Sequence, residues 1–269
     1  MEMSWMANDY QHLSLGREDA VATVTLARPD SRNALNPALI SDLTTCFDDL
    51  AEDDNIRVVV LTGEGPSFCA GADIGYMRET ARYSYRDNLK DARKLVAMYL
   101  AVDECPKPVV AKVRGAGIGG GAGLVAASDV VVAAEGAKFA FTEVRLGIAP
   151  ATIAPFVARK IGVSRARALF LSGERFDAGR AREIGLVHEV VPESGLEATV
   201  DAQVSGLLKG GPGAQAAIKA LLRDIESVEM ADAPGLMSRM NAMLRVSEEG
   251  QEGLGAFLAK REPSWRRGG

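Results

Sequence analysis

The stretch KVRGAGIGGGAGLVAASDVVVAAE, residues 112–135, decides the fold. Its glycines Gly115, Gly117 and Gly120 have the spacing G-x-G-x-x-G between two strand-like runs, which matches a dinucleotide-binding βαβ unit. However, only about eight residues separate Gly120 from the next strand, which is short for a crossover helix. The alternative is that these glycines allow close backbone packing at a strand-to-helix corner.

The same glycines suggest a different use of a helix start. Consecutive glycines leave backbone N–H groups unobstructed, and a helix N-terminus stabilises negative charge. Such an N–H can hold an oxyanion as well as a phosphate, but one donor is rarely sufficient. The segment SFCAGADIGYM, residues 67–77, places a second small-residue turn before a possible helix, with Asp73 expected to cap that helix. We therefore predict that two turns converge on one carbonyl oxygen.

Composition excludes several classes of function. The chain has 269 residues, a net charge of −5, 47% apolar residues and a mean hydropathy of +0.02, which are typical of a globular protein of one large domain or one domain with an appendage. Three cysteines and no signal-peptide layout in residues 1–12 predict reduced thiols and a cytoplasmic location. Two histidines and no C-x-x-C argue against a metal site. The acidity argues against nucleic acid binding, and the lack of a long apolar run argues against a membrane span.

The order of predicted elements indicates an α/β architecture followed by a helical tail. Asn36 and Pro37 have the residue types that begin a helix. Strands are expected at residues 21–29, 56–63, 108–113, 129–135 and 137–144, separated by helical segments. Later, apolar residues recur at helical spacing, namely Ile218, Leu221, Leu222, Ile225, Leu236, Met240, Met243, Leu244, Leu254, Phe257 and Leu258. We expect a core of residues 1–200 and a helical region of residues 201–269.

An ordered set of motifs then identifies a family. These are RNALN (32–36), GPSFCAGADI (65–74), KPVVAKVRGAGIGGGAGLVAASDVVVAA (107–134), FAFTEVRLGIAP (139–150), SGERFDAGRAREIGLVHEVVP (172–192) and GLGAFLAKREPSW (253–265). Their order and spacing resemble the crotonase superfamily, the enoyl-CoA hydratase/isomerase family, over about residues 10–265. The resemblance implies a spiral of ββα units forming two nearly perpendicular sheets. It also implies a C-terminal helical region that drives assembly into a trimer or a dimer of trimers.

The resemblance implies an acyl-CoA thioester substrate, with coenzyme A as part of the substrate and no other cofactor. It places two oxyanion-hole donors at the backbone N–H groups of Ala72 and Gly120, which would stabilise an enolate. Arg28 and Arg32 would bind phosphates, although a solvated surface charge explains them equally well. Phe257 and Lys260 would reach the coenzyme A of a neighbouring subunit. The remaining coenzyme A contacts would come from Ala34, Leu35, Ala70, Ala72, Asp73, Ile74 and Gly120.

The chain departs from the family pattern at one glutamate. The resemblance implies two catalytic glutamates in a hydratase, and here the first position is Gly123 while the second is Glu143. Two carboxylates hold a water for addition, whereas one can move a proton along an enoyl chain, which is isomerisation. The segment TEVRLGIAPATIAPF (142–156) resembles bacterial hydratases of branched glutaconyl-CoA substrates, several of which also lack the first glutamate.

We therefore expect a hydratase in fatty, branched-chain or isoprenoid acyl-CoA degradation, with Glu143 as base and acid in turn. The alternatives are a Δ3-Δ2-enoyl-CoA isomerase and a non-catalytic acyl-CoA-binding member. The apolar neighbours of Glu143 would raise its pKa if it is buried. His188 is expected to be structural, and Cys69 lacks an evident histidine partner for nucleophilic catalysis. Loops such as residues 75–95 are expected to form the acyl pocket.

Overall fold

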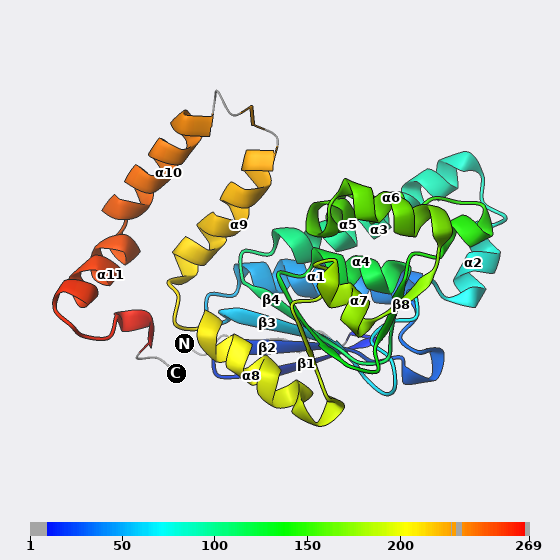
Figure 1. Ribbon diagram of the computed structural model, residues 1–269, viewed down its shortest axis with the longest axis horizontal. Coiled ribbons are helices and arrows are strands. Elements are labelled where there is room, and N and C mark those ends of the chain that lie inside the picture. Colours follow the sequence, from blue (N-terminus) through cyan, green and yellow to red (C-terminus); the bar gives the residue numbers. More distant parts are fainter. Residues whose placement is uncertain (1–9, 227, 230–232, 267–269) are drawn as a thin grey trace.

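A computed structural model describes residues 10–226, 228–229 and 233–266, and contains two β-sheets (Figure 1). The larger sheet has the order β1-β2-β3-β4-β6-β9, with bounds Leu13–Glu18, Val21–Leu26, Val58–Gly63, Val109–Val113, Val130–Ala134 and Glu189–Val191. The smaller sheet has the order β5-β7-β8, with bounds Ala116–Ile118, Lys138–Ala140 and Arg175–Asp177. Pairing is parallel except for β1 with β2 and β7 with β8. The predicted α/β class is confirmed. The signal-peptide expectation concerns residues that lie mostly outside the described range.

The chain repeats one path through both sheets. β4 in the larger sheet is followed by β5 in the smaller sheet and then by α4 (Gly120–Ala127). β6 and β7 follow in the same way and lead into the 3₁₀ helix η2 (Glu143–Leu146). In the preceding repeat, β3 is followed by Cys69, which pairs in parallel with Gly117 of β5, and then by α2 (Ile74–Thr80). This succession is the expected spiral of ββα units.

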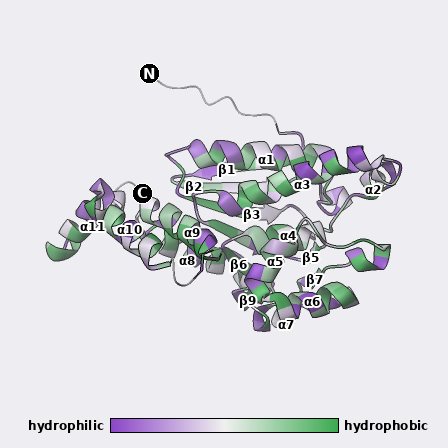
Figure 2. Ribbon diagram, turned by 90° about the horizontal axis from the view of Figure 1, so that it is seen from above, coloured by the Kyte–Doolittle hydropathy of each residue, from purple (hydrophilic) through white to green (hydrophobic). Residues whose placement is uncertain are grey.

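Helices cover both faces of the larger sheet. α1 (Pro37–Glu52) and α3 (Tyr85–Glu104) lie side by side on one face (Figure 2). As predicted, the Asn36 side chain caps α1 by accepting a hydrogen bond from Leu39 N at 2.8 Å. On the other face, α8 (Leu196–Leu207) packs its buried side chains against valines of β3, β4 and β6. The candidate site lies at the smaller sheet, outside the part of the larger sheet that helices cover on both faces.

The remaining helices are α5 (Ala154–Ile161), α6 (Val163–Ser172), α7 (Ala178–Glu183), α9 (Pro212–Glu226), α10 (Ala233–Val246) and α11 (Glu248–Leu258), with the 3₁₀ turns η1 (Pro29–Ser31), η3 (Glu193–Gly195) and η4 (Ser264–Arg266). We call α9–α11 the helical arm, because these helices extend away from the core (Figure 1). The sequence predicted a boundary between the core and a C-terminal helical region after residue 200. This position lies inside α8, which packs on the larger sheet, and the division into two regions stays a prediction. No helix in the described ranges is long and apolar enough to cross a membrane.

The structure corrects two expectations about element boundaries. The strand expected at residues 137–144 ends at Ala140, because Glu143 begins η2. Residues 75–95 form most of α2 and the first half of α3 instead of loops.

The glycines that opened the sequence analysis have separate structural roles. Gly115 has a φ of +59°, and a Cβ there would collide with the carbonyl oxygen of Pro66. Gly117 lies in β5, where a Cβ would come within 3.1 Å of the Phe139 ring. Gly120 begins α4. Because a strand of the second sheet stands between β4 and α4, this is not the strand-turn-helix of a dinucleotide site. The close-packing interpretation is the one confirmed.

Candidate active site

Three successive repeats each place one candidate group where the smaller sheet gives way to a helix. Ala72 follows the Cys69 pairing and precedes α2, Gly120 follows β5, and Glu143 follows β7. These turns are adjacent, because a Cβ on Gly119 would lie 3.2 Å from Glu143 Oε1 and 4.0 Å from the Cα of Gly71. The fold therefore gathers the three groups that the sequence singled out.

The backbone of Ala72 is oriented by pairing with Leu35. Leu35 N–H donates to the Gly71 carbonyl at 2.7 Å, and Asp73 N–H donates to the Leu35 carbonyl at 2.9 Å. In this parallel pattern the N–H of the intervening residue points away from its neighbour. The hydrogen bonds found among the described residues accordingly include none from Ala72 N–H. This donor is available to a ligand.

The backbone of Gly120 is placed by α4 and by its neighbours. As the first residue of the helix it carries one of the N–H groups that lack an intrahelical partner. Gly119, with φ 51° and ψ −118°, donates its own N–H to the Ala140 carbonyl at 2.8 Å. A Cβ on Gly120 would lie 2.7 Å from Leu35 Cδ1 and 2.8 Å from Tyr99 Oη. A side chain at position 120 would therefore have to displace Leu35 or Tyr99, and Leu35 contacts both donor turns.

The carboxyl group of Glu143 lies against the Gly119 turn. Its Oε2 is shielded from solvent and accepts no hydrogen bond from the described part of the chain. Burial raises its pKa. Of the apolar neighbours in sequence that suggested this burial, Phe139 and Phe141 are fully buried, whereas Val144 and Leu146 are exposed. A carboxyl group with a raised pKa and a free oxygen beside two backbone donors is suited to proton transfer.

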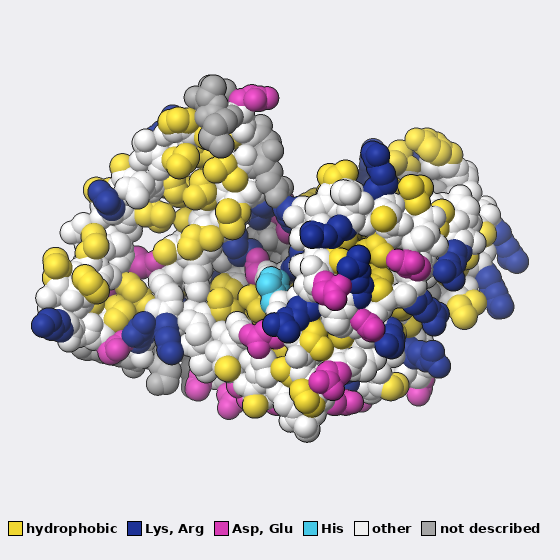
Figure 3. Space-filling model, in the orientation of Figure 1, with side chains coloured by type: hydrophobic (Ala, Val, Ile, Leu, Met, Phe, Trp, Pro, Cys, Tyr) yellow, Lys and Arg dark blue, Asp and Glu magenta, His cyan; other side chains and the backbone are white. Residues whose placement is uncertain are grey.

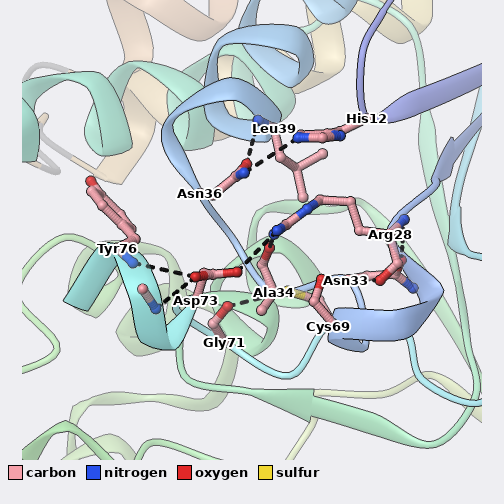
Figure 4. Close-up of polar contacts among 12 residues, drawn as sticks. His12, Arg28, Asn33, Ala34, Asn36, Leu39, Cys69, Gly71, Asp73 and Tyr76 are labelled. Atoms are coloured by element: carbon pink, nitrogen blue, oxygen red, sulfur yellow. Dashed lines mark hydrogen bonds and ion pairs between the residues drawn. The ribbon is translucent and has the colours of Figure 1, made fainter. Parts of the chain in front are cut away.

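Charged side chains support the Ala72 turn (Figure 4). Asp73 caps α2, accepting from Gly75 N at 2.8 Å and Tyr76 N at 3.3 Å, which confirms its predicted capping role. Arg28 donates to Asp73 Oδ2 at 3.0 Å and to the Ala34 carbonyl. Burial alone would raise the pKa of Asp73, but these hydrogen bonds outweigh it and hold the pKa below its usual value.

Asn33 is a supporting residue that the sequence analysis missed. It is fully buried with a φ of 56°, a left-handed conformation that asparagine tolerates better than most residues. Its Nδ2 donates to the Glu64 and Ser67 carbonyls at 2.9 and 2.8 Å, and its Oδ1 accepts from Arg28 N at 2.9 Å. An asparagine two residues after a short proline-initiated turn was the available signal.

The predicted coenzyme A residues divide into two groups. Segments 32–36 and 69–73 are hydrogen-bonded to each other, which brings together Arg28, Arg32, Ala34, Leu35, Ala70, Ala72, Asp73 and Ile74. Arg28 is already paired with Asp73, and Arg32 is exposed, so their phosphate contacts stay predictions. Phe257 on α11 and the following Lys260 are exposed and lie far from these segments in the single chain (Figure 1).

Two other candidates are structural, as expected. His188 Nδ1 accepts from Val131 N at 2.9 Å, which ties β6 to the segment before β9. Burial raises the pKa of Cys69 to about 12, so it stays a protonated thiol. Within the described ranges, no group of three or more His, Cys, Asp or Glu side chains is arranged to hold a metal ion.

Comparison with known proteins gives a consistent result. Residues 16–268 match the family model described as enoyl-CoA hydratase/isomerase. The chain is 35% identical over 256 residues to the 2,3-dehydroadipyl-CoA hydratase of Escherichia coli, covering 94% of this chain and 98% of that protein. It resembles the structure of an enoyl-CoA hydratase from Shewanella pealeana with a TM-score of 0.92 and 36% identity, covering 96% and 97% of the two chains. It also resembles the structure of AtuE from Pseudomonas aeruginosa, with a TM-score of 0.91 and 38% identity, covering 95% of this chain and 99% of that chain.

Proposed function

Because this chain belongs to the enoyl-CoA hydratase/isomerase family, we propose that it adds water to a 2-enoyl-CoA thioester with Glu143 as its single proton-transferring carboxylate. The observation that carries the proposal is the position of Glu143. Its partly buried carboxyl group, with Oε2 shielded from solvent and unpaired within the described chain, lies against the same turn that starts α4. The proton carrier is therefore next to a backbone donor.

The mechanism follows from the roles of these groups. The thioester oxygen accepts hydrogen bonds from the N–H groups of Ala72 and Gly120. Ionised Glu143 takes a proton from a water as the water oxygen bonds to carbon 3, and the carbon 2–carbon 3 π electrons move toward the thioester oxygen as an enolate. Protonated Glu143 then returns its proton to carbon 2, giving the 3-hydroxyacyl-CoA. Two aligned donors favour this route, since each contributes about a hundred- to a thousandfold in rate.

Substitution of Glu143 tests the proposal. Glu143→Gln keeps the shape but cannot take the proton, so kcat for a true substrate should fall by about a hundred- to ten-thousandfold. Binding of a saturated acyl-CoA, measured by calorimetry, should persist. The exposed Glu174→Gln is the matched control and should retain activity. Near-normal turnover by Glu143→Gln would exclude this role.

Isomerisation is the second candidate, and the observation that favours it is at Gly123. A Cβ there would lie 2.9 Å from Tyr99 Cε1 and would also collide with Ile153 Cγ2, so the position has no room for a second carboxylate. A single carboxylate can move a proton between carbons 2 and 4. Product mass separates the two reactions, because hydration adds one water whereas isomerisation leaves the mass unchanged. Acyl-CoA binding with neither product would indicate a non-catalytic member.

The acyl chain is best identified with a panel of substrates. Crotonyl-CoA, 3-methylglutaconyl-CoA and a 3-enoyl-CoA represent the fatty, branched and isomerase possibilities. The name of the Escherichia coli relative adds 2,3-dehydroadipyl-CoA. We expect one of the 2-enoyl-CoA esters to give the highest kcat/KM, without any added metal or redox cofactor. Highest turnover of the 3-enoyl-CoA would favour the isomerase instead.

Assembly into a trimer or dimer of trimers is part of the proposal. Figure 3 shows hydrophobic side chains gathered over the helical arm. The exposed large hydrophobic residues of α9, α10 and α11 are Ile218, Leu222, Met237, Met243, Val246, Leu254, Phe257 and Leu258, each at least half exposed in the single chain. Contact with another copy would cover them and would carry Phe257 and Lys260 toward its coenzyme A. Light scattering should give a mass of three or six chains, and a monomer would contradict this.

A further inference from the structure

The space beside Gly123, the position that lacks a glutamate, is occupied by Ile153 and Tyr99. Tyr99, on α3, is 1% exposed, and its ring packs against Phe156 with centroids 5.8 Å apart. Its Cε1 and the side chain of Ile153 occupy the space into which a side chain on Gly123 would extend. The missing carboxylate has therefore not left an empty space beside α4.

Tyr99 also brings a hydroxyl group to the first turn of α4. Its Oη donates to the Gly120 carbonyl at 3.1 Å and lies 2.8 Å from where a Cβ on Gly120 would be. Burial, and the nearby Cys69, Glu143 and Tyr76, raise the pKa of Tyr99 well above its usual value. The hydroxyl therefore stays protonated and acts as a donor throughout the neutral pH range.

The first turn of α4 needs this support because of its composition. Gly119, Gly120 and Gly121 follow one another, and glycine backbones have the greatest conformational freedom. The peptide that carries the Gly120 N–H is held through its Gly119 carbonyl, which accepts a hydrogen bond from Gly123 N at 3.0 Å, and the peptide before that is held by the bond from Gly119 N–H to the Ala140 carbonyl at 2.8 Å. The peptide after Gly120 is fixed by Tyr99, while Leu35 fills the space beside it. Both sides of the Gly120 N–H are thus held by residues outside the glycine run.

We propose that Tyr99 is a positioning residue that aims the Gly120 N–H at the thioester oxygen, through its hydrogen bond to the Gly120 carbonyl. The inference rests on the proposed oxyanion role of Gly120. A displacement of about 1 Å in a group that contacts the reacting atoms can cost about a hundredfold in rate. Loss of the hydroxyl should therefore affect the charged, enolate-like state more than the uncharged ground state.

Ser128 offers a matched control on the same helix. Its Oγ is buried and donates to the Leu124 carbonyl at 2.9 Å, near the opposite end of α4. Tyr99→Phe and Ser128→Ala each remove one buried hydroxyl-to-carbonyl hydrogen bond, so the two variants should lose similar, small amounts of stability. Tyr99→Phe keeps the ring packed against Phe156. Thermal unfolding should show similar small losses of Tm for both variants.

The experiment measures kcat and KM for hydration of the best 2-enoyl-CoA in the wild type and both variants. It also measures binding of acetoacetyl-CoA, whose enolate is followed by its ultraviolet absorbance, and of butyryl-CoA, which carries no enolate. Tyr99→Phe should lower kcat about ten- to a hundredfold. It should leave KM within about twofold and weaken enolate binding by the same factor as kcat, while butyryl-CoA binding is unchanged. Ser128→Ala should match the wild type in all of these.

The two proposals fail separately in this design. If the wild type hydrates none of the esters, the proposed reaction is wrong, but enolate binding still tests Tyr99. If Tyr99→Phe binds the enolate and turns over substrate as Ser128→Ala does, the tyrosine is merely structural and the inference is overturned. Equal loss of enolate and butyryl-CoA binding would overturn it as well, because the hydroxyl would then act on general binding.

Discussion

The Ala72 turn and the Gly120 turn present the same chemical group but are stabilised in different ways. The Ala72 turn is held by an ion pair whose Arg28 and Asp73 side chains are 17% and 22% exposed. The Gly120 turn begins a helix whose residues 121–127 are all buried, and its contacts are a tyrosine hydroxyl and the side chain of Leu35. Leu35 joins the two, through its backbone on one side and its side chain on the other.

This difference shows that a backbone N–H donor can be held in position in two ways, by an ion pair as in the Ala72 turn or by close packing as in the Gly120 turn. The two solutions have different weaknesses. Partly exposed charges respond to pH and salt, whereas a close-packed glycine helix responds to added volume.

The largest effect is expected from adding one methyl group to the Gly120 turn. A Cβ on Gly121 would lie 2.8 Å from Cys69 Cβ and would collide with the Cys69 carbonyl oxygen. Gly121→Ala should therefore lower the free energy of unfolding by about 3 kcal/mol, as overpacking of a core does. In the Ala72 turn, Gly75 has only Asp73 Oδ1 within 4 Å, at 3.1 Å, so Gly75→Ala should change stability by less than about 1 kcal/mol. Urea unfolding measures both, and equal losses would contradict the comparison.

An alkaline effect is expected at the far end of α4. Lys160 donates to the Val125 carbonyl at 3.5 Å and to the Ser128 carbonyl, and burial lowers its pKa to about 8. Between this value and the usual 10.5, the unfolded chain binds the proton and the folded chain does not, so stability rises with pH. Relative to Lys160→Met, the wild type should gain at most about 3 kcal/mol across that window.

Chemical denaturation between pH 7 and pH 10 measures this gain. Substitution of the exposed Lys138 by Met, Lys138→Met, is the control. The difference in free energy of unfolding between this variant and the wild type should stay constant over the same pH range. A flat difference for Lys160→Met would show that the buried end of α4 carries no titrating charge.

The smallest effect is expected at the ion pair of the Ala72 turn. Asp73→Asn keeps an oxygen to cap α2 but removes the charge that pairs with Arg28, which should cost about 0.5 kcal/mol at pH 7. Because the folded pKa of Asp73 is lowered, this stability is fully present above the usual value of 3.8 and is lost as pH falls through the lowered pKa. The wild type and the variant should therefore converge in acid, as measured by thermal unfolding from pH 7 to pH 2.5.

Salt adds a second test of the same pair. High salt should shrink the difference at Asp73, because the ion pair is partly exposed. It should leave the loss in Gly121→Ala unchanged. A loss at Gly121 that also faded in salt would mean that charge, and not packing, holds the buried turn.

Much of the architecture was predictable because its signals are local. The β-branched runs became β2, β3, β4 and β6, the Asn36–Pro37 pair began α1, and Asp73 capped α2. The three-residue strands β5, β7 and β8 were harder to predict from the sequence, because strands this short form only when they pair with strands from elsewhere in the chain. This is why the segment after Ala140, including Glu143, was mistaken for strand.

The site was predictable in its backbone donors but not in its supports. Glycines and small residues after a strand mark the Gly120 and Ala72 turns in the sequence itself. Tyr99 and Ile153 come from segments on either side of Gly123 and meet it only in the folded chain. Sequence alone could therefore show that a glutamate is absent at position 123, but not that Ile153 and Tyr99 occupy its place.

The use of main-chain groups has a consequence for inheritance. An N–H belongs to every residue except proline, so most codon changes at Ala72 leave the donor chemistry in place. The proposed proton carrier, Glu143, is by contrast a side chain that a single nucleotide change can delete. A descendant of this gene can therefore lose the proposed proton carrier in one step while it keeps both backbone N–H groups.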